Sequence, residues 1–265
     1  MHTPDSDISL SLITFAYNEE EGLERQLRQW NGELSRFVAD WEIVLVDDAS
    51  TDRTGGIADR LSAEDPRIRV IHREKNGGVG RAIGLARRHV SKDWVFWNDI
   101  DGHFDLKDLE KVLPYLRDPD VDILVCFKHD NMGGKSSSFH WFKSRANYYL
   151  LRLLFLSGIC DFQFVQFYPR LYFCQGIELE AYSSFVPPEC VLKAQAISLN
   201  IRQIQLRYFS HAHHVSKTTL RTIVLSVVNI FSFWLRWRFG GGRKRTLETF
   251  QQNCRGGRPW RKSCS

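Results

Sequence analysis

The stretch Trp94-Val95-Phe96-Trp97-Asn98-Asp99-Ile100-Asp101 decides how this chain folds and where its chemistry lies. Its first four residues form an apolar run typical of a buried β-strand, and the two acids follow where that strand should end in a loop. Two carboxylates one residue apart repel each other unless a cation lies between them. A hard divalent ion that also bridges two phosphate oxygens fits such a pair, although a solvated loop or helix cap is the alternative interpretation.

The residues before this stretch alternate between short apolar runs and amphipathic segments. Such alternation predicts an α/β fold, a Rossmann-like and mostly parallel sheet with helices on both faces. In sheets of this kind, ligands bind beyond the carboxyl ends of the strands. The predicted strands are Ile8–Phe15, Trp41–Val46, Ile68–His72 and Asp93–Trp97, and the predicted helices are Asn18–Trp30, one ending near Ala63, and Arg81–His89.

The second half of the chain has a different composition. Its predicted elements are a helix over Asp105–Leu116, a strand over Val121–Phe127, a helix from Pro187 to about Leu199 and a strand over Ile201–Tyr208. The segment Phe139–Leu156 is rich in aromatic and aliphatic residues, with Lys and Arg interspersed. A buried core helix and an interfacial membrane helix both fit this composition, and both interpretations stay open.

The stretch from Thr222 to Leu235 has no charged residue. Its polar residues recur every three or four positions, so they form one narrow stripe of a helix whose opposite face is apolar. The stretch is shorter than the ~20 residues that a membrane span needs. We therefore predict an amphipathic, membrane-associating helix over residues 218–239. It follows a main domain over residues 1–217, which includes the segment at about 139–156.

Positive charge is concentrated at the C-terminal end. From Arg236 onward the chain has nine Lys or Arg residues and one acid, a net charge of +8, whereas residues 1–235 carry −3. Such a cluster fits an anionic partner, either nucleic acid or an anionic membrane surface. No reader motif accompanies these bases, so we expect no nucleic-acid partner. Residues 240–265 are predicted to form a basic, flexible tail.

The cysteines and the N-terminus bear on the compartment. The six cysteines show no C-x-x-C pairing, which argues against a zinc site or a disulfide framework and favours a reducing compartment. Residues Met1 to Asp7 are polar and acidic, so we expect no signal peptide.

Three further motifs carry candidate chemistry. Tyr17, directly after the first strand, is placed to stack on a base, although a core tyrosine is the alternative. In the loop Asp47–Asp52, one acid is expected to cap the next helix, while Asp48 is expected to accept hydrogen bonds from a nucleobase or ribose. The loop Asn76–Gly80 lacks the Lys-Ser/Thr of a P-loop, so we expect a tight loop whose backbone approaches a ligand.

The motifs Phe15-Ala16-Tyr17-Asn18-Glu19, Val46-Asp47-Asp48-Ala49-Ser50-Thr51-Asp52 and Asp99-Ile100-Asp101, in this order and spacing, resemble family 2 glycosyltransferases of the GT-A fold. In the second half, the residues that resemble the polyprenyl-phosphate (dolichol-phosphate) mannosyltransferase branch are Asp161, Arg170, Glu189 and Ser216-Lys217. The resemblance covers residues 8 to 237.

The resemblance implies an inverting, metal-dependent hexosyltransferase that moves a sugar from a nucleotide-diphosphate sugar to a polyprenyl phosphate. The implied cofactor is Mg²⁺ or Mn²⁺. The implied location is the cytoplasmic face of the cell membrane, where the protein would be peripheral. A saccharide or other small-molecule acceptor of cell-envelope polysaccharide synthesis stays open as an alternative, and so does a separate membrane subunit.

The resemblance also implies roles for individual residues. Asp99 and Asp101 would be catalytic at the diphosphate, and Asp101 and His103 would be metal ligands. The residues implied to bind the nucleotide sugar are Phe15, Tyr17, Glu19, Val46, Asp48, Asp99, Ile100, Asp101, Lys128, Arg170, His211 and Lys217.

The chain departs from the family pattern at several positions. Phe15 stands where a proline is usual, His211 where an arginine is expected, and His214 where a glycine is expected. Residues Phe164-Val165-Gln166-Phe167 replace a small Ser-Gly-Phe type of segment. These departures leave the nucleotide site more strongly predicted than the sugar and acceptor pocket, and they do not fix the donor sugar as mannose.

Overall fold

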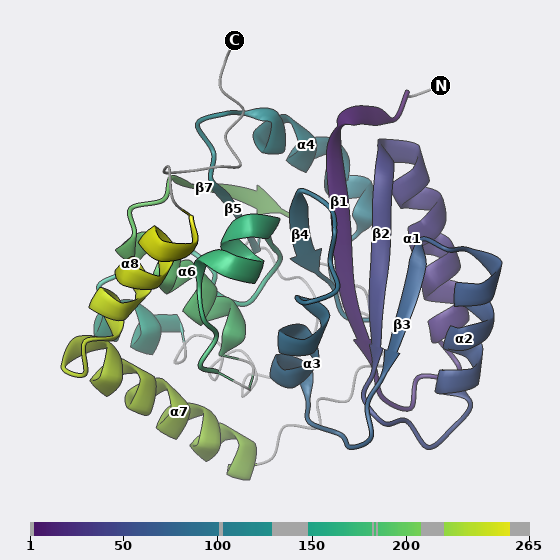
Figure 1. The fold of residues 1–265 in the computed structure, drawn as a ribbon. Helices are drawn as coiled ribbons and strands as arrows, with labels where there is room; N and C mark the ends of the chain where they lie inside the picture. The colour runs from purple at the N-terminus through teal and green to yellow at the C-terminus, as the bar shows by residue number, and fades with distance from the viewer. Residues whose placement is uncertain are drawn as a thin grey trace.

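A computed structural model describes residues 3–100, 103–128, 148–181, 183, 185–207 and 220–254 of the chain. A seven-stranded sheet with strand order β3-β2-β1-β4-β6-β5-β7 lies at its centre (Figure 1). The strands are β1 (Asp5–Ala16), β2 (Val38–Asp47), β3 (Ile68–His72), β4 (Trp94–Trp97), β5 (Ile123–Lys128), β6 (Gln166–Pro169) and β7 (Ile201–Leu206). Every pair of neighbours is parallel except the two that include β6, which confirms the predicted mostly parallel sheet.

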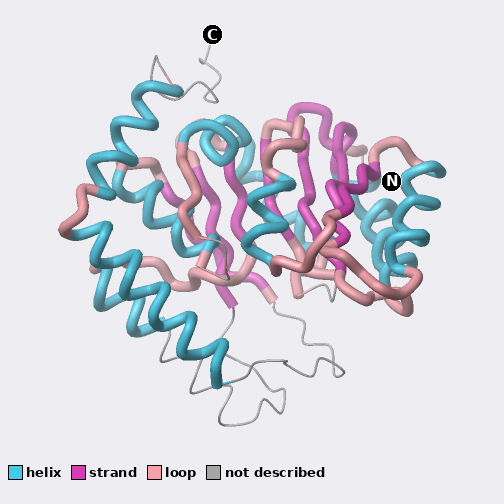
Figure 2. The backbone as a smooth tube through the Cα atoms, turned by 60° about the horizontal axis from the view of Figure 1, so that its bottom comes forward, coloured by secondary structure: helices cyan, strands magenta, loops and turns pink. Residues whose placement is uncertain are grey.

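Helices cover both faces of this sheet, as predicted (Figure 2). One layer consists of α1 (Leu23–Phe37), α2 (Thr54–Glu64) and α4 (Leu109–Arg117). The other contains α3 (Val79–Ala86), α6 (Val186–Ala196), α7 (Leu220–Arg238) and α8 (Gly242–Asn253). Shorter helical pieces are η1 (Leu106–Asp108), the π-helical turn η2 (Tyr172–Gly176) and residues 148–155.

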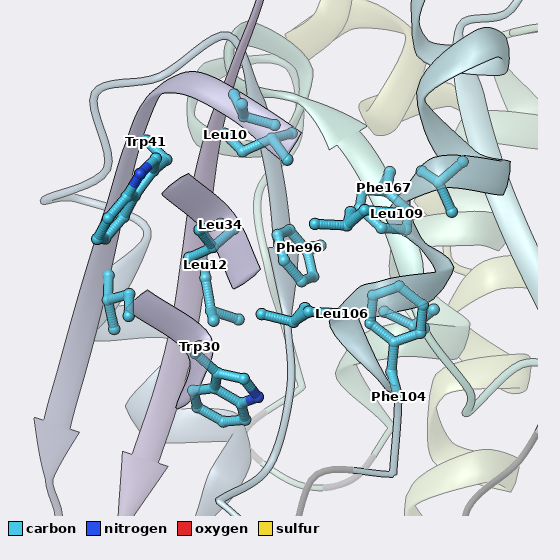
Figure 3. Close-up of a cluster of buried hydrophobic side chains, with 14 of the residues drawn as sticks. Leu10, Leu12, Trp30, Leu34, Trp41, Phe96, Phe104, Leu106, Leu109 and Phe167 are labelled. Carbon is cyan, nitrogen blue, oxygen red and sulfur yellow. The ribbon is translucent and has the colours of Figure 1, made fainter. Parts of the chain in front are cut away.

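The strands are apolar on both faces because each face is buried. In β2, Ile43 and Leu45 belong to one core cluster while Val44 and Val46 belong to the other, as expected when successive side chains point to opposite faces. Figure 3 shows the first cluster, in which Phe96 of β4 lies at the centre. Its ring stacks on Phe167 of β6, with 4.7 Å between the ring centroids. The long apolar runs of the sequence are thus accounted for by a two-sided core.

Strand β6 is absent from the predicted elements. It consists of four buried residues and runs antiparallel between β4 and β5. A run of four residues without alternating polarity carries little periodic signal. Because β6 is reversed, the residues that lead into it lie beside the carboxyl ends of β4 and β5, whereas its last residue, Pro169, pairs with Trp94 at the start of β4.

Most predicted elements are present with shifted ends. Helix α1 begins at Leu23 rather than Asn18, because Asn18, with φ of 56°, belongs to a loop. Helix α3 ends at Ala86 rather than His89. The helix predicted from Asp105 begins as the turn η1, where the Asp105 carboxylate accepts a hydrogen bond from the Lys107 backbone N–H at 3.0 Å.

The C-terminal region differs in part from its prediction. The helix expected over residues 218–239 is present as α7, whose side chains are described from residue 227 on. The flexible-tail prediction is wrong for residues 242–254, because α8 forms there and Phe250 and Cys254 are buried in the second core cluster. Residues 255–265 lie outside the described part. None of the described helices is both long and apolar enough to cross a membrane.

A buried ion pair within α6 holds the segment between η2 and α6, and this segment in turn contacts α7. The Glu189 carboxylate lies 2.7 Å from the Lys193 ammonium, and both side chains are almost completely buried. Glu189 also accepts hydrogen bonds from the backbone N–H groups of Glu180 and Ala181, each at 2.8 Å. The Glu180 carboxylate in turn contacts Arg236 of α7 at 3.2 Å. Each buried charge therefore has partners that offset its desolvation.

We expect Phe96→Ala to lower the free energy of unfolding by about 3–5 kcal/mol, because it leaves a cavity at the centre of the first core cluster. Phe239→Ala is the matched control. Its side chain is 74% exposed, so its replacement should change stability by no more than about 0.5 kcal/mol. Urea denaturation of both variants tests this, and equal losses would contradict the assigned core.

Candidate active site at the carboxyl edge of the sheet

The loops that follow β1 and β2 are bonded to each other. The Asn18 side-chain oxygen accepts the Thr51 backbone N–H at 2.9 Å, and the Asn18 backbone N–H donates to the Ser50 hydroxyl at 3.1 Å. The Glu19 backbone N–H donates to the Thr54 hydroxyl at 2.8 Å. These bonds hold the two loops together as one polar rim at the carboxyl ends of the central strands.

Two acids of the loop after β2 organise it. Asp52 accepts the backbone N–H of Thr54, the first residue of α2, at 2.9 Å, although the N-cap position itself is Arg53, so no acid of this loop is the N-cap residue that the sequence predicts. Asp47 accepts the Ser50 backbone N–H at 3.0 Å, and its other oxygen lies 2.9 Å from Nδ1 of His72. The loop is therefore fixed both to α2 and to β3.

Asp48 lies at this rim with its side chain buried. Its carboxylate is ion-paired with Arg73 and accepts the backbone N–H groups of Gly77, at 3.1 Å to each oxygen, and Gly78, at 2.7 Å. The glycine-rich loop thus brings its backbone to Asp48, whereas the sequence predicts an approach to a ligand. Three donors thus make four contacts with the two oxygens, about as many as a carboxylate has lone-pair positions.

The structure explains why the loop needs glycine at two positions. Gly78 has φ of 75° and ψ of 173°, a backbone conformation that is essentially restricted to glycine. A Cβ atom at Gly77 would overlap the Arg73 guanidinium, so a side chain there would displace this arginine from Asp48.

The other residues predicted to bind a nucleotide differ in what they can offer. Tyr17 is 40% exposed at the end of β1, so a ring face is available for stacking. Glu19 is half-buried nearby, and Phe15 is half-buried against the second core cluster. The side chains of Val46 and Ile100 belong to the core, so these two residues can contact a ligand only through backbone atoms.

A cavity of about 230 Å³ opens beyond the carboxyl ends of β4 and β5. Asp99, His103 and Lys128 all line it, so the structure brings three of the predicted site residues together. Asn98 and Phe104 are bonded to each other at this end of the sheet, because the Asn98 side-chain N–H donates to the Phe104 carbonyl at 2.8 Å. The lining residues are Val79, Trp97, Asn98, Asp99, His103, Phe104, Lys128, Gln163, Phe164, Val165 and Pro187.

Lys128 is a partly buried cation in this cavity. Burial lowers the pKa of its ammonium, and the charge of Asp161 acts in the opposite direction. The ammonium lies 5.8 Å from the centroid of the Phe164 ring. Asp161 also shapes the cavity wall, because its carboxylate accepts the backbone N–H groups of Gln163 and Phe164 at 2.9 and 3.1 Å. Since burial penalises the charged form of Lys128, an anion bound in the cavity would stabilise it.

The predicted metal site is described only in part. Asp99 and His103 supply a carboxylate and an imidazole to one cavity, and this donor set fits Mn²⁺ or Mg²⁺. Asp101, predicted to be both a metal ligand and catalytic, lies outside the described residues. Within the described part of the chain, no three His, Cys, Asp or Glu side chains gather as metal ligands.

Not every predicted residue reaches the site. His211 and Lys217 lie outside the described residues. Arg170 is placed at the opposite end of the sheet, where its backbone N–H donates to the Asp93 carbonyl at 2.7 Å, one residue before β4 begins. The reversed direction of β6 accounts for this placement, so the prediction that Arg170 binds the nucleotide sugar is not supported.

Sequence reasoning missed Arg73, Gln163 and Phe164 as site residues. Arg73 follows β3 directly, and its place at a strand end is the signal that could have identified it as the partner of Asp48. Gln163 and Phe164 line the cavity only because β6 is antiparallel. Without that strand in the prediction, no local pattern marks them.

Comparison with known proteins places these features in a family. The family model described as "Glycosyl transferase family 2" matches residues 11–173. A dolichyl-phosphate beta-glucosyltransferase of Trichomonas vaginalis is 30% identical over 167 residues, 60% of this chain and 52% of that protein. An undecaprenyl-phosphate mannosyltransferase of Micrococcus luteus is 36% identical over 113 residues, 40% of this chain and 44% of that protein. The chain thus spans about half or less of the curated relatives it matches.

Solved structures with the same fold include two phosphoglycerate-glycosylating enzymes. Mannosyl-3-phosphoglycerate synthase from Rubrobacter xylanophilus aligns with a TM-score of 0.66 and 18% identity, covering 87% of this chain and 75% of that chain. Glucosyl-3-phosphoglycerate synthase from Mycobacterium tuberculosis, in complex with Mn²⁺ and uridine diphosphate, aligns with a TM-score of 0.59 and 18% identity, covering 93% and 80%. At this identity the likeness concerns the fold.

We expect Arg73→Leu to destabilise the protein by about 1–3 kcal/mol, because it leaves the buried Asp48 carboxylate with backbone partners alone. Arg53→Leu is the matched control. This arginine pairs with Glu20 at 3.0 Å in the same rim but is 85% exposed, so its loss should cost less than about 1 kcal/mol. Thermal unfolding of both variants provides the measurement, and equal shifts would contradict the assigned role of Arg73.

Proposed function

Because this chain belongs to glycosyl transferase family 2, we propose that it transfers a sugar from a nucleotide-diphosphate sugar to a polyprenyl phosphate, with inversion at the anomeric carbon. The observation that carries this proposal is the cavity in which Asp99, His103 and Lys128 meet beside the polar rim. The rim supplies groups for a nucleoside, and the cavity supplies groups for a diphosphate and an attacking anion.

The donor half of the reaction needs a nucleoside held in a fixed orientation. Tyr17 offers an exposed ring for stacking, and Asp48, which Arg73 and the glycine loop fix in place, would accept a nucleoside donor in exchange for one of these contacts. Such fixed contacts place the diphosphate and the sugar over the cavity before reaction, which is where positioning contributes to rate. Asp99 lies at the cavity wall nearest to the end of β4, where the diphosphate would lie.

The departing nucleotide diphosphate gains negative charge as its bond to the sugar breaks. Asp99, Asp101 and His103 would hold Mg²⁺ or Mn²⁺, which supplies charge neutralisation at the leaving group when bound. An acceptor phosphate is already an anion, so its oxygen attacks the anomeric carbon without a strong general base. Lys128 would attract and orient this phosphate, since burial has left its charge poorly solvated.

A lipid acceptor is supported by exposed apolar residues on the helix at residues 148–155 and on α7. The helix at residues 148–155 packs on α7, with the Trp234 indole N–H donating to the Leu154 carbonyl at 2.8 Å. The two helices and their ends expose large apolar residues, which together we term the apolar helix surface: Tyr149, Leu153, Leu156, Val227, Val228, Phe231, Leu235 and Phe239. Single exposed apolar residues are ordinary, but a group of this kind marks an interaction surface.

Basic residues border the apolar helix surface. Arg236 and Arg238 lie in the last turn of α7, and Arg243, Lys244 and Arg245 follow at the start of α8. Apolar insertion together with attraction to anionic headgroups is the usual basis for binding a membrane surface. We propose that the protein is peripheral at the cytoplasmic face of the cell membrane, where it meets its lipid acceptor. The names of the polyprenyl-phosphate-specific relatives support the same acceptor class.

A small-molecule acceptor is the second candidate. The solved structures of the same fold include enzymes named for phosphoglycerate, which is also a phosphorylated acceptor. Lys128 would serve either acceptor. The apolar helix surface favours the lipid, because a water-soluble acceptor gives it no role.

We expect Asp99→Asn to lower sugar transfer at least about a hundredfold, because a neutral amide cannot balance a bound divalent ion. The assay is formation of lipid-linked label from labelled UDP- and GDP-sugars, Mg²⁺ or Mn²⁺, and undecaprenyl phosphate. Asp101→Ala should behave similarly.

Asp93→Asn is the matched control, because Asp93 is exposed at the opposite end of the same strand. It should retain wild-type activity. Label in phosphoglycerate or a saccharide, but none in lipid, would replace the lipid proposal with the second candidate. Full activity of Asp99→Asn would overturn the proposed site.

We expect the double variant Phe231→Ser/Leu235→Ser to bind vesicles that contain phosphatidylglycerol at least about tenfold more weakly, because it removes two apolar side chains from the apolar helix surface. Leu247→Ser removes a side chain of similar exposure from α8 and serves as the control. Co-sedimentation with anionic and with neutral vesicles measures both effects. Unchanged sedimentation of the double variant would contradict the proposed membrane contact.

A further inference from the structure

His72, at the end of β3, lies between two carboxylates. Its Nδ1 atom is 2.9 Å from Asp47 of β2, and its Nε2 atom is 2.9 Å from Asp59 of α2. Neutral imidazole has one N–H group, so it can satisfy only one of these acceptors, whereas imidazolium donates to both. The geometry therefore fits a histidine that is held as a cation.

The surroundings of His72 support the same protonation state. Hydrogen bonds to Asp59 and then to Asp47 raise the pKa of His72 above its usual value. These two acids are in direct contact with the ring, one on the neighbouring strand and one on α2. Arg73, the next residue, pairs with Asp48 instead. Deprotonation would leave two carboxylates facing one donor.

Asp47 links His72 to the nucleoside end of the site. Its carboxylate accepts the Ser50 backbone N–H at 3.0 Å, and its backbone carbonyl accepts the Arg73 N–H at 3.0 Å. Asp48, the next residue along the chain, carries the carboxylate that we assign to the nucleoside. Helix α2 packs closely against the same contact. A Cβ atom at Gly55 of this helix would lie 3.0 Å from the Asp47 carboxylate and 3.5 Å from the His72 ring.

We propose that protonated His72 is a positioning residue for nucleoside binding, which it supports by holding the Asp47–Ser50 turn through a double contact with Asp47 and Asp59. This inference rests on the proposed nucleotide-dependent function. The protonation of His72 would make nucleotide affinity depend on pH, although His72 itself does not contact the nucleotide. The pKa of His72 is raised in the folded protein. Its contribution to holding the Asp47–Ser50 turn is therefore complete at pH values below the ordinary histidine pKa, and it is lost as pH rises through the pKa of His72 in the folded protein.

The test combines NMR and calorimetry on the full chain. The His72 ring proton is titrated by NMR, and the dissociation constants of UDP and GDP with Mg²⁺ are measured between about pH 6 and pH 8.5. We expect His72 to titrate above the ordinary value, and affinity to fall about two- to fivefold along the same curve, the range typical of partly exposed ion pairs.

Three variants separate positioning from a purely structural role. His72→Gln should lose the part of the pH dependence that comes from His72. The part that remains in this variant measures titration of the nucleotide itself. Asp59→Asn should move the NMR midpoint and the affinity midpoint to lower pH together, since it removes the larger cause of the shift. His89→Gln, which changes an exposed histidine after α3, should behave as wild type.

The outcomes distinguish this inference from the proposed function. If wild type binds a nucleotide but His72→Gln keeps the full pH dependence, or if His72 titrates at its ordinary value, the positioning role is wrong and the proposed function stands. If wild type binds no nucleotide at any pH, both are wrong.

Discussion

The buried Asp48 carboxylate, held by Arg73 and by two glycine amides, is the interaction on which the candidate site depends. It brings together the end of β2, the residue after β3 and the loop before α3, three segments that are separate along the chain. A carboxylate buried away from water needs several hydrogen-bond donors. The backbone N–H groups of Gly77 and Gly78 supply two of them, and glycine has no side chain that would hinder their approach. Because these contacts fix the Asp48 carboxylate, the loops around it are held at a common point of attachment.

Much of the fold follows from residue pattern alone. Runs such as Ile43–Val46 are apolar at every position, which fits a strand buried on both faces, and helices on both faces follow from that. The reversed strand β6 does not follow, because four residues without periodicity are compatible with loop, strand or helix. Likewise, Gly242–Asn253 is strongly polar in sequence, and its helical state depends on the burial of Phe250 and Cys254 against distant elements.

The same division applies to the site. Asp99, His103 and Lys128 meet because each follows or ends a strand, and strand ends converge in a parallel sheet. Arg170 is the opposite case. Its role was implied by the family resemblance, but such a resemblance does not give the direction of the strand before it, and the antiparallel pairing of β6 places Arg170 at the far edge of the sheet. The partner of Asp48 lies 25 residues away, so only the position of Arg73 directly after a predicted strand could have indicated this ion pair.

The reversal of β6 has a consequence for how such a protein can change. The cavity receives one wall from strand ends that also organise the rim, and another from Gln163–Val165, a segment held by Asp161 and independent of the rim. Replacing Gln163–Val165 would change the shape of the cavity and leave the contacts of the polar rim unchanged. One antiparallel strand therefore separates the rim, whose contacts depend on one another, from a cavity wall that can vary by itself, and under the proposed function variation of that wall would change the acceptor without loss of nucleotide binding.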